Sequence, residues 1–314
     1  MKIDRRLIVY LDLFRHILNL LINHPEYVCK DLEDDHSESD LLRIVWSPIL
    51  EFIFPKKNYV KVKTGETINA ISQQQKKDLY CEEDSVKAFK IDIRVIHNTN
   101  GAEVDIVAGE IAIDDEDTKL VSDEGKLCRE TKDAVDAMIS ITGNPVQAIG
   151  LQINGSTCLV TLNTLARNGL YVYLPYFTFS LPTCIRDLNS FSNTFQQLFT
   201  LEKLVLQTSQ LLQHHLKEKQ SFDSLGRHRE DDLSDSILNW RRETFYTPPN
   251  KNCKAKVPAY IFGTPSSEFV SKLLSAKYSE GEAVSYDAHG WGKWGNKWHN
   301  KITNDVLEES PYGD

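Results

Sequence analysis

Three carboxylate residues lie inside apolar stretches of this chain where strands are expected. Asp92 stands in the middle of KIDIRVI, and Asp105 and Glu110 stand in EVDIVAGEIAI. An acid in a strand that is otherwise buried costs several kcal/mol unless another group pairs with it. Acids that a fold keeps at such positions often bind a metal ion or transfer protons. The stretch Lys90–Asp136 is therefore the first place to look for a functional site.

The two apolar stretches are predicted to form a hairpin. Residues 88–96 and 102–113 have the composition of strands, and the dipeptide Asn100-Gly101 between them favours a tight turn. An acidic loop follows, and then a helix is expected near 119–140, ended by Gly143-Asn144-Pro145. The candidate acids would thus lie on two paired strands that lead directly into a helix.

The alternation of side chains along a strand limits which acids can share a site. In a regular strand neighbouring side chains point to opposite faces of the sheet, so Asp105 and Glu110 would face opposite ways unless a bulge intervenes at Gly109. At most one of them would line the same site as Asp92. We take Glu110 as the first choice and Asp105 as the alternative ligand.

The remaining elements follow from apolar periodicity and turn residues. Residues 41–54 are predicted to be helical, residues 71–78 form a loop or a short helix, and a long helix spans about 186–218. Further strands are expected at 59–70, 146–154, 156–165 and 169–179.

The order helix, strand, strand, strand, helix, strand, with acids on the second and third strands, resembles the PD-(D/E)XK nuclease fold over residues 41–165. The resemblance implies an α/β domain with a mixed central sheet flanked by helices, extended by helical N- and C-terminal additions. It also implies a site in which a glutamate on the first helix, an aspartate on the second strand and a Glu-x-Lys on the third surround one or two divalent metal ions. In this chain those positions are Glu51, Asp92 and Glu110.

The lysine of that signature is absent, because Ala112 stands two residues after Glu110. Members of the family relocate this lysine to the following helix, so the resemblance implies Lys126 or Lys132 in its place. Asp92 and Glu110 would bind Mg²⁺ or Mn²⁺, which prefer hard oxygen ligands. The phrases GEIA and KL.RETKD are also similar to those of uncharacterised proteins of early-diverging fungi, a resemblance that implies no activity.

Each candidate also has a structural interpretation. Asp92 could form a cross-strand ion pair with Arg94, and Glu110 could face solvent at the end of its strand. The helix segment KLCRETKDAVD offers i,i+4 pairs such as Lys132–Asp136, which are typical of a solvated face. Glu66, on the strand at 59–70, is a further acid with a weaker claim to the site.

Two functions from different classes remain. The first is a metal-dependent phosphodiesterase that acts on nucleic acid, with candidate residues Glu51, Asp92, Glu110, Lys126 and Lys132. The second is a catalytically inactive protein of the same fold that serves as a protein-interaction or effector-type module. The acids within consecutive strands favour the first, and Ala112 together with the acidic surface favours the second.

Composition sets outer bounds. A net charge of −9 with a pI near 5.5 excludes a general nucleic-acid coat protein, which would be strongly basic. Six scattered cysteines without metal-binding spacing suit a reducing compartment, so we expect an intracellular protein of the cytoplasm or nucleus. The apolar run near the N-terminus is interrupted by Asp12, Arg15 and His16. This pattern indicates an amphipathic helix rather than a signal peptide or membrane segment.

Four regions are predicted along the chain. They are an N-terminal amphipathic helix at 1–30, the α/β nuclease-like domain at 41–216, a polar flexible linker at 217–256 and a Trp/Lys-rich tail at 257–314. The tail interleaves Trp291, Trp294 and Trp298 with lysines. This segment would either dock its tryptophans on the rest of the chain or stack on the bases of single-stranded nucleic acid.

Overall fold

The computed structural model describes most of the chain up to residue 244 and three short segments after it. The described residues are 5–29, 36–54, 59–80, 86, 90–99, 102–113, 117–224, 237–244, 291–294, 297–300 and 306–307. The chain divides into two units, 1–255 and 256–314.

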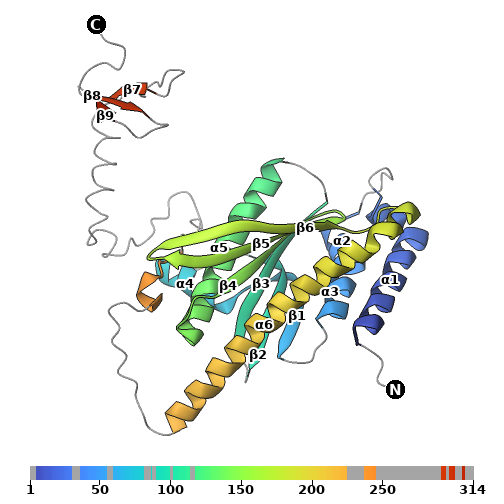
Figure 1. Ribbon diagram of the computed structural model, residues 1–314, viewed down its shortest axis with the longest axis horizontal. Coiled ribbons are helices and arrows are strands. Elements are labelled where there is room, and N and C mark those ends of the chain that lie inside the picture. Colours follow the sequence, from blue (N-terminus) through green and yellow to red (C-terminus); the bar gives the residue numbers. More distant parts are fainter. Residues whose placement is uncertain are drawn as a thin grey trace. The chain divides into compact units, whose positions relative to one another are not determined.

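The first unit is an α/β structure built on a mixed sheet of six strands (Figure 1). The strands lie side by side in their sequence order. They are β1 (Val60–Thr67), β2 (Ile91–Thr99), β3 (Ala102–Ala112), β4 (Gln147–Asn154), β5 (Thr157–Arg167) and β6 (Leu170–Ser180). β3 and β4 are parallel, and every other neighbouring pair is antiparallel. The long helix α5 (Asp117–Thr142) makes the crossover that parallel neighbours require.

The two faces of the sheet carry different helices, as the side chains of β2 show. His97 Nδ1 lies 2.8 Å from the hydroxyl of Ser209 on α6 (Phe191–Ser224). Arg94, on the opposite face, donates to the backbone oxygen of Ile68 just before α4 (Ala70–Leu79). α5 packs on β3, β4 and β5.

The layer that contains α6 also holds the N-terminal helices. α1 (Arg5–Asn23) packs on α3 (Ser47–Ile53), and α3 packs on α6 and β1. α1 buries only one side, through Val9, Leu13, Ile17 and Leu20, as expected for an amphipathic helix. Between α1 and α3 lie a 3₁₀ turn (Pro25–Tyr27), the short α2 (Glu38–Leu41) and a π-helical turn (Leu42–Trp46).

The hairpin and the later strands confirm the sequence predictions. β2 and β3 pair antiparallel, and β4, β5 and β6 form a meander at the expected places. The segment 71–78 is helical: it belongs to α4, which Asn69 caps by accepting from the backbone N–H groups of Ile71 and Ser72. The last helix differs from expectation, since 185–190 is 3₁₀ and α6 continues to Ser224. The rest of the predicted linker is described only at 237–244 and includes the 3₁₀ turn Ile237–Trp240.

The second unit contains a small antiparallel sheet. Its strands are β7 (Trp291–Trp294), β8 (Lys297–Asn300) and β9 (Val306–Leu307). The glycines in and around the first strand disfavour a helix, and the segment is extended. Most of the predicted tail at 257–314 lies outside the described residues, and docking of its tryptophans stays a prediction.

Candidate active site

Asp92 and Glu110 lie on neighbouring strands and on the same face of the sheet. The backbone register pairs Ile93 with Gly109, which places the two acids one step further along the same two strands. Asp92 Oδ2 accepts a hydrogen bond of 3.2 Å from the backbone N–H of Ile111. The close pairing of β2 and β3 thus fixes one carboxylate against the strand that carries the other.

Lys126 reaches this pair from the helix that follows β3. Its ammonium group donates to Glu110 Oε2, and its side chain is 25% exposed whereas that of Glu110 is 4% exposed. Ala112, at the strand position where a lysine would belong to the signature, is buried and apolar. A cation from α5 therefore stands beside Glu110, as one of the two sequence alternatives predicted.

Burial changes the proton affinity of both acids. Burial raises the pKa of Glu110 to about 8; Lys126 opposes the shift, and the negative charges of Asp92 and Asp123 add to it. Burial also raises the pKa of Asp92, against the hydrogen bond from Ile111 and the charge of Lys126. For Lys126, burial alone would lower the pKa, but the contact with Glu110 raises it overall. The site thus holds a carboxyl group that can exchange a proton near neutral pH.

A β-bulge brings a third acid, Asp105, to the same face. Val95 pairs with Val107 and Ile96 pairs with Asp105, so Ile106 is an extra residue in β3. The prediction that Asp105 and Glu110 face opposite ways is therefore wrong, because the bulge shifts the alternation by one residue. The bulge lies at Ile106 and not at Gly109.

Asp105 is nevertheless occupied by structural partners. Its Oδ1 lies 2.8 Å from Arg94 Nη2, and Asn69 donates to its Oδ2. Both charged side chains are almost fully buried, so this is a buried ion pair completed by an amide. The proposed pair of Arg94 with Asp92 is replaced by a pair with Asp105, which removes Asp105 from the candidate ligands.

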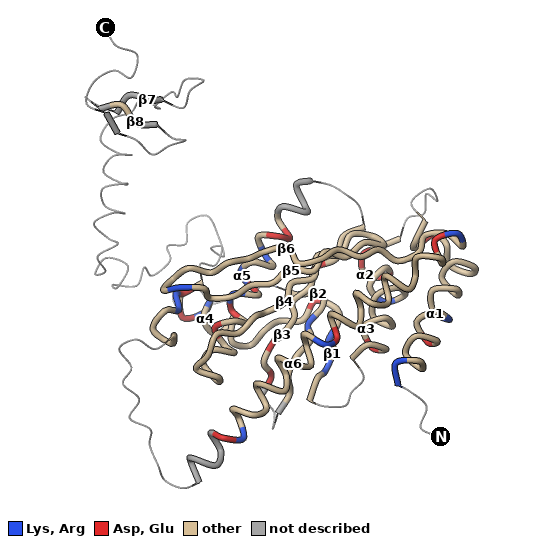
Figure 2. Tube along the Cα trace, in the orientation of Figure 1, with Lys and Arg blue, Asp and Glu red and all other residues tan. Residues whose placement is uncertain are grey.

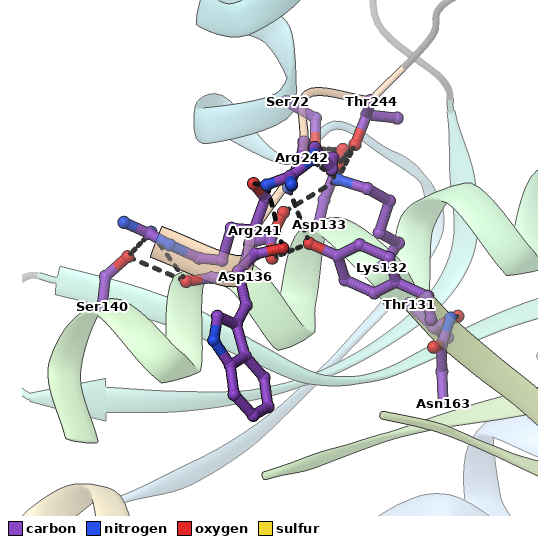
Figure 3. A network of polar contacts seen from close by, with 12 residues as sticks. Ser72, Thr131, Lys132, Asp133, Asp136, Ser140, Asn163, Arg241, Arg242 and Thr244 are labelled. Atoms are coloured by element: carbon purple, nitrogen blue, oxygen red, sulfur yellow. Dashed lines mark hydrogen bonds and ion pairs between the residues drawn. The ribbon is translucent and has the colours of Figure 1, made fainter. Parts of the chain in front are cut away.

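The other two sequence candidates lie elsewhere. Glu51 is exposed on α3, in the layer of α1 and α6, and the structure does not place it beside the two acids. Lys132 donates to Asp136 Oδ2 at 2.8 Å and to Thr244 Oγ1 at 2.8 Å, and its ammonium lies 4.7 Å from the centre of the Tyr171 ring. Figure 3 shows Lys132 inside this polar network. Lys132 is thus held by residues outside the Asp92–Glu110 pair.

A nearby acid with a weaker sequence claim is Glu66. β1 is irregular between Thr64 and Thr67, where Gly65 and Glu66 both have positive φ, of 84° and 31°. This irregularity sets Glu66 near the start of β2, where it pairs with Lys90 and its charge helps to raise the pKa of Asp92. The sequence TGET contains the glycine that such a bulge favours.

Comparisons with protein-family models, with curated proteins and with solved structures find no match for this chain. The residues themselves carry the functional argument. Among the described residues, no three His, Cys, Asp or Glu side chains gather closely enough to form a complete metal site. None of the helices in that part of the chain has the length and apolar composition that crossing a bilayer requires.

The α5 side of the site contains an acid that the sequence analysis did not single out, Glu130. Asp123, Lys126, Glu130 and Asp133 recur every three or four residues along α5, and the three acids among them are buried. Reading this helix as a solvated face was therefore wrong on its sheet side. The Lys132–Asp136 pair on the same helix is confirmed. Figure 2 shows acidic and basic positions interleaved along α5.

Proposed function

We propose that this chain is a divalent-metal-dependent phosphodiesterase that acts on nucleic acid. The observation that supports the proposal best is the meeting of Asp92, Glu110 and Lys126 from three successive elements, β2, β3 and α5. This arrangement supplies the acid, acid and lysine of the signature although Ala112 interrupts it in sequence.

The residues present fit a hard divalent cation. Asp92 and Glu110 would hold Mg²⁺ or Mn²⁺ through carboxylate oxygens, and Glu110 Oε1 is a buried oxygen without a hydrogen-bond partner in the described part. When bound, the ion would stabilise the charge that develops on the scissile phosphate and lower the pKa of a water molecule. Glu110 must first release the proton that its raised pKa keeps near neutral pH.

Lys126 lies within hydrogen-bonding distance of Glu110, and its charge also attracts Asp92. In the structure it holds Glu110 Oε2, which fixes the direction of the carboxylate. A cation on a flexible side chain, partly exposed, can also turn to a phosphate oxygen or to the attacking water. Lys126 would thus position Glu110 at rest and neutralise charge on the substrate.

A cleavage assay tests the proposal. The folded protein is incubated with single- and double-stranded DNA and RNA in Mg²⁺ or Mn²⁺, with a chelator as the blank. We expect cleavage that the chelator abolishes and that Asp92→Asn and Lys126→Met each reduce by roughly a hundredfold or more, the range for loss of a charge-stabilising or proton-transferring group. The matched control is Lys77→Met, an exposed lysine on α4, which should cleave like the wild type.

The second candidate is a catalytically inactive module that binds another protein. The contact between Lys126 and Glu110 favours it, because the ion pair lets the cluster neutralise itself without a metal ion. Absence of cleavage of every substrate by folded wild-type protein in Mn²⁺ would contradict the phosphodiesterase and leave this candidate as the better account.

A further inference from the structure

Glu130 is a buried acid whose oxygens have no hydrogen-bond partner among the described residues. Its side chain lies on α5, the residue is 5% exposed, and neither Oε1 nor Oε2 has a partner within the described part of the chain. A buried polar group without a hydrogen bond destabilises a fold. Such a group is explained when it binds a ligand, carries a proton or has a functional role.

One carboxylate oxygen of Glu110 is likewise buried and without a hydrogen-bond partner among the described residues. Lys126 occupies its Oε2, while its Oε1 is buried and without a partner in the same part of the structure. After burial itself, the charge of Glu110 is the largest influence on the pKa of Glu130, and Lys126 attracts both acids. The two carboxyl groups thus influence each other across the contact between β3 and α5, and three of their oxygens have no partner among the described residues.

The neighbouring acids do not share this condition. Asp105 is held by Arg94 and Asn69. Asp133 accepts from the hydroxyl of Ser72 at 2.6 Å and from that of Thr244. Among the described acids on this side of the sheet, only Glu110 and Glu130 thus have fully buried oxygens without a hydrogen-bond partner.

We propose that Glu130 and Glu110 together form a divalent-cation site, in which Glu130 supplies from helix α5 a carboxylate ligand. The inference rests on the proposed function, since the cation would again be Mg²⁺ or Mn²⁺ and Glu110 would be the ligand that this site shares with the site of Asp92. Two carboxylates are enough for such an ion because Mg²⁺ commonly keeps several of its water molecules. Lys126, which contacts Glu110, would move aside as the cation replaces its charge.

Calorimetric titration with MnCl₂ at about pH 7 tests the proposal without relying on catalysis. The titration is repeated in two buffers of different ionisation enthalpy, so that protons released on binding are counted. We expect the wild type to bind Mn²⁺ and release protons. Glu110→Gln and Glu130→Gln should each weaken binding by roughly tenfold or more and release fewer protons. The control is Glu124→Gln, an exposed acid on the same helix, which should match the wild type.

The outcomes separate this inference from the proposed function. If Glu130→Gln binds Mn²⁺ and releases protons like the wild type while Glu110→Gln does not, Glu130 is no ligand, and the phosphodiesterase proposal stands. If Mn²⁺ binding depends on both acids but no nucleic acid is cleaved, the cation site stands and the phosphodiesterase fails. Absence of Mn²⁺ binding to the wild type overturns the cation site, and cleavage without divalent metal overturns the metal-dependent phosphodiesterase.

Discussion

At the scale of single residues, the buried acids couple the stability of the protein to pH. Burial raises the pKa of Glu130 well above its ordinary value of 4.5, so the folded state retains a proton that the unfolded state loses. The proton that the folded state retains contributes to the free energy of unfolding. That contribution is fully present below the ordinary pKa of the carboxyl group and is lost as pH rises through its folded-state pKa. Glu130, which lacks a hydrogen-bond partner in the described part of the chain, thus destabilises the metal-free protein most at alkaline pH.

Glu130→Gln removes this penalty. We expect the variant to be more stable than the wild type at about pH 8 and almost equally stable at about pH 5, because the wild-type carboxyl is protonated in the folded state at the lower pH. Urea unfolding at the two pH values measures the difference, with the exposed Glu124→Gln as control. Equal destabilisation at both pH values would show that the carboxylate has a structural partner.

The sequence could predict Asp92 and Glu110 because both interrupt apolar strands. It could not choose between Lys126 and Lys132, since both lie on the same helix and the choice depends on what packs against each. The sequence alone did not indicate Glu130, because a charged helix segment is normally exposed to solvent. Only the packing of α5 on strands that carry polar side chains shows that Glu130 is buried.

At the scale of elements, the pairing of β2, β3 and β4 determines where Glu110 points. The strands and the hairpin follow from alternation and turn residues, but a bulge at Ile106 leaves no comparable sign in EVDIVAGEIAI. One extra residue changes the facing of everything on one side of it, which is why Asp105 was placed on the wrong face.

At Gly109 the neighbouring strands β2 and β4 leave little space for a side chain. A Cβ added there would lie 3.1 Å from Ile93 Cβ and 3.2 Å from Leu151 Cβ, on the two neighbouring strands. We expect Gly109→Ala to destabilise the protein by about 1–3 kcal/mol, the usual cost of overpacking, and to weaken Mn²⁺ binding by displacing the adjacent Glu110.

Denaturant unfolding and the Mn²⁺ titration check this expectation. The control is Gly125→Ala on α5, where nothing lies within 4 Å of the added Cβ, and where alanine should stabilise the helix by up to about 1 kcal/mol. A Gly109→Ala protein with wild-type stability would mean that the strands separate easily, and that the site geometry does not depend on their close approach.

At the scale of the whole first unit, a segment far along the chain closes over α5. Residues 237–244, here called the strap, lie against the β5–β6 turn, where the N–H of Gly169 donates to Trp240 O at 2.8 Å. In Figure 3 the strap meets α5 through Arg241, Arg242 and Thr244. Thr244 shares Asp133 with Ser72 of α4, so strap, α5 and α4 are joined by one carboxylate.

The strap binds Lys132, which leaves Lys126 as the lysine available to the site. Lys132 donates to Arg242 O and Thr244 Oγ1 of the strap, and to Asp136, which also accepts from the hydroxyl of Tyr171 at 2.6 Å. Nothing in the segment KLCRETKDAVD indicates this role, because the partners come from residues more than a hundred positions later.

Replacing each lysine by methionine should therefore have opposite effects on stability and on cleavage. Lys132→Met leaves the hydroxyl of the buried Thr244 and the carboxylate of the half-buried Asp136 without this donor, so we expect a loss of about 1–3 kcal/mol in the free energy of unfolding. Cleavage and Mn²⁺ affinity of the folded fraction should stay unchanged. Lys126→Met should keep nearly wild-type stability near neutral pH, because Glu110 can take up a proton there, while cleavage is lost.

Thermal unfolding and cleavage measured on the same preparations separate the two roles, and Thr244→Val tests the strap from its other side. This variant should lose stability like Lys132→Met and keep cleavage. Loss of cleavage in Lys132→Met at wild-type stability would identify Lys132 as the lysine of the site, and would mean that the strap leaves α5 when substrate binds. Loss of stability without loss of cleavage, in both Lys132→Met and Thr244→Val, fits a lysine whose role is to hold the end of the first unit against α5.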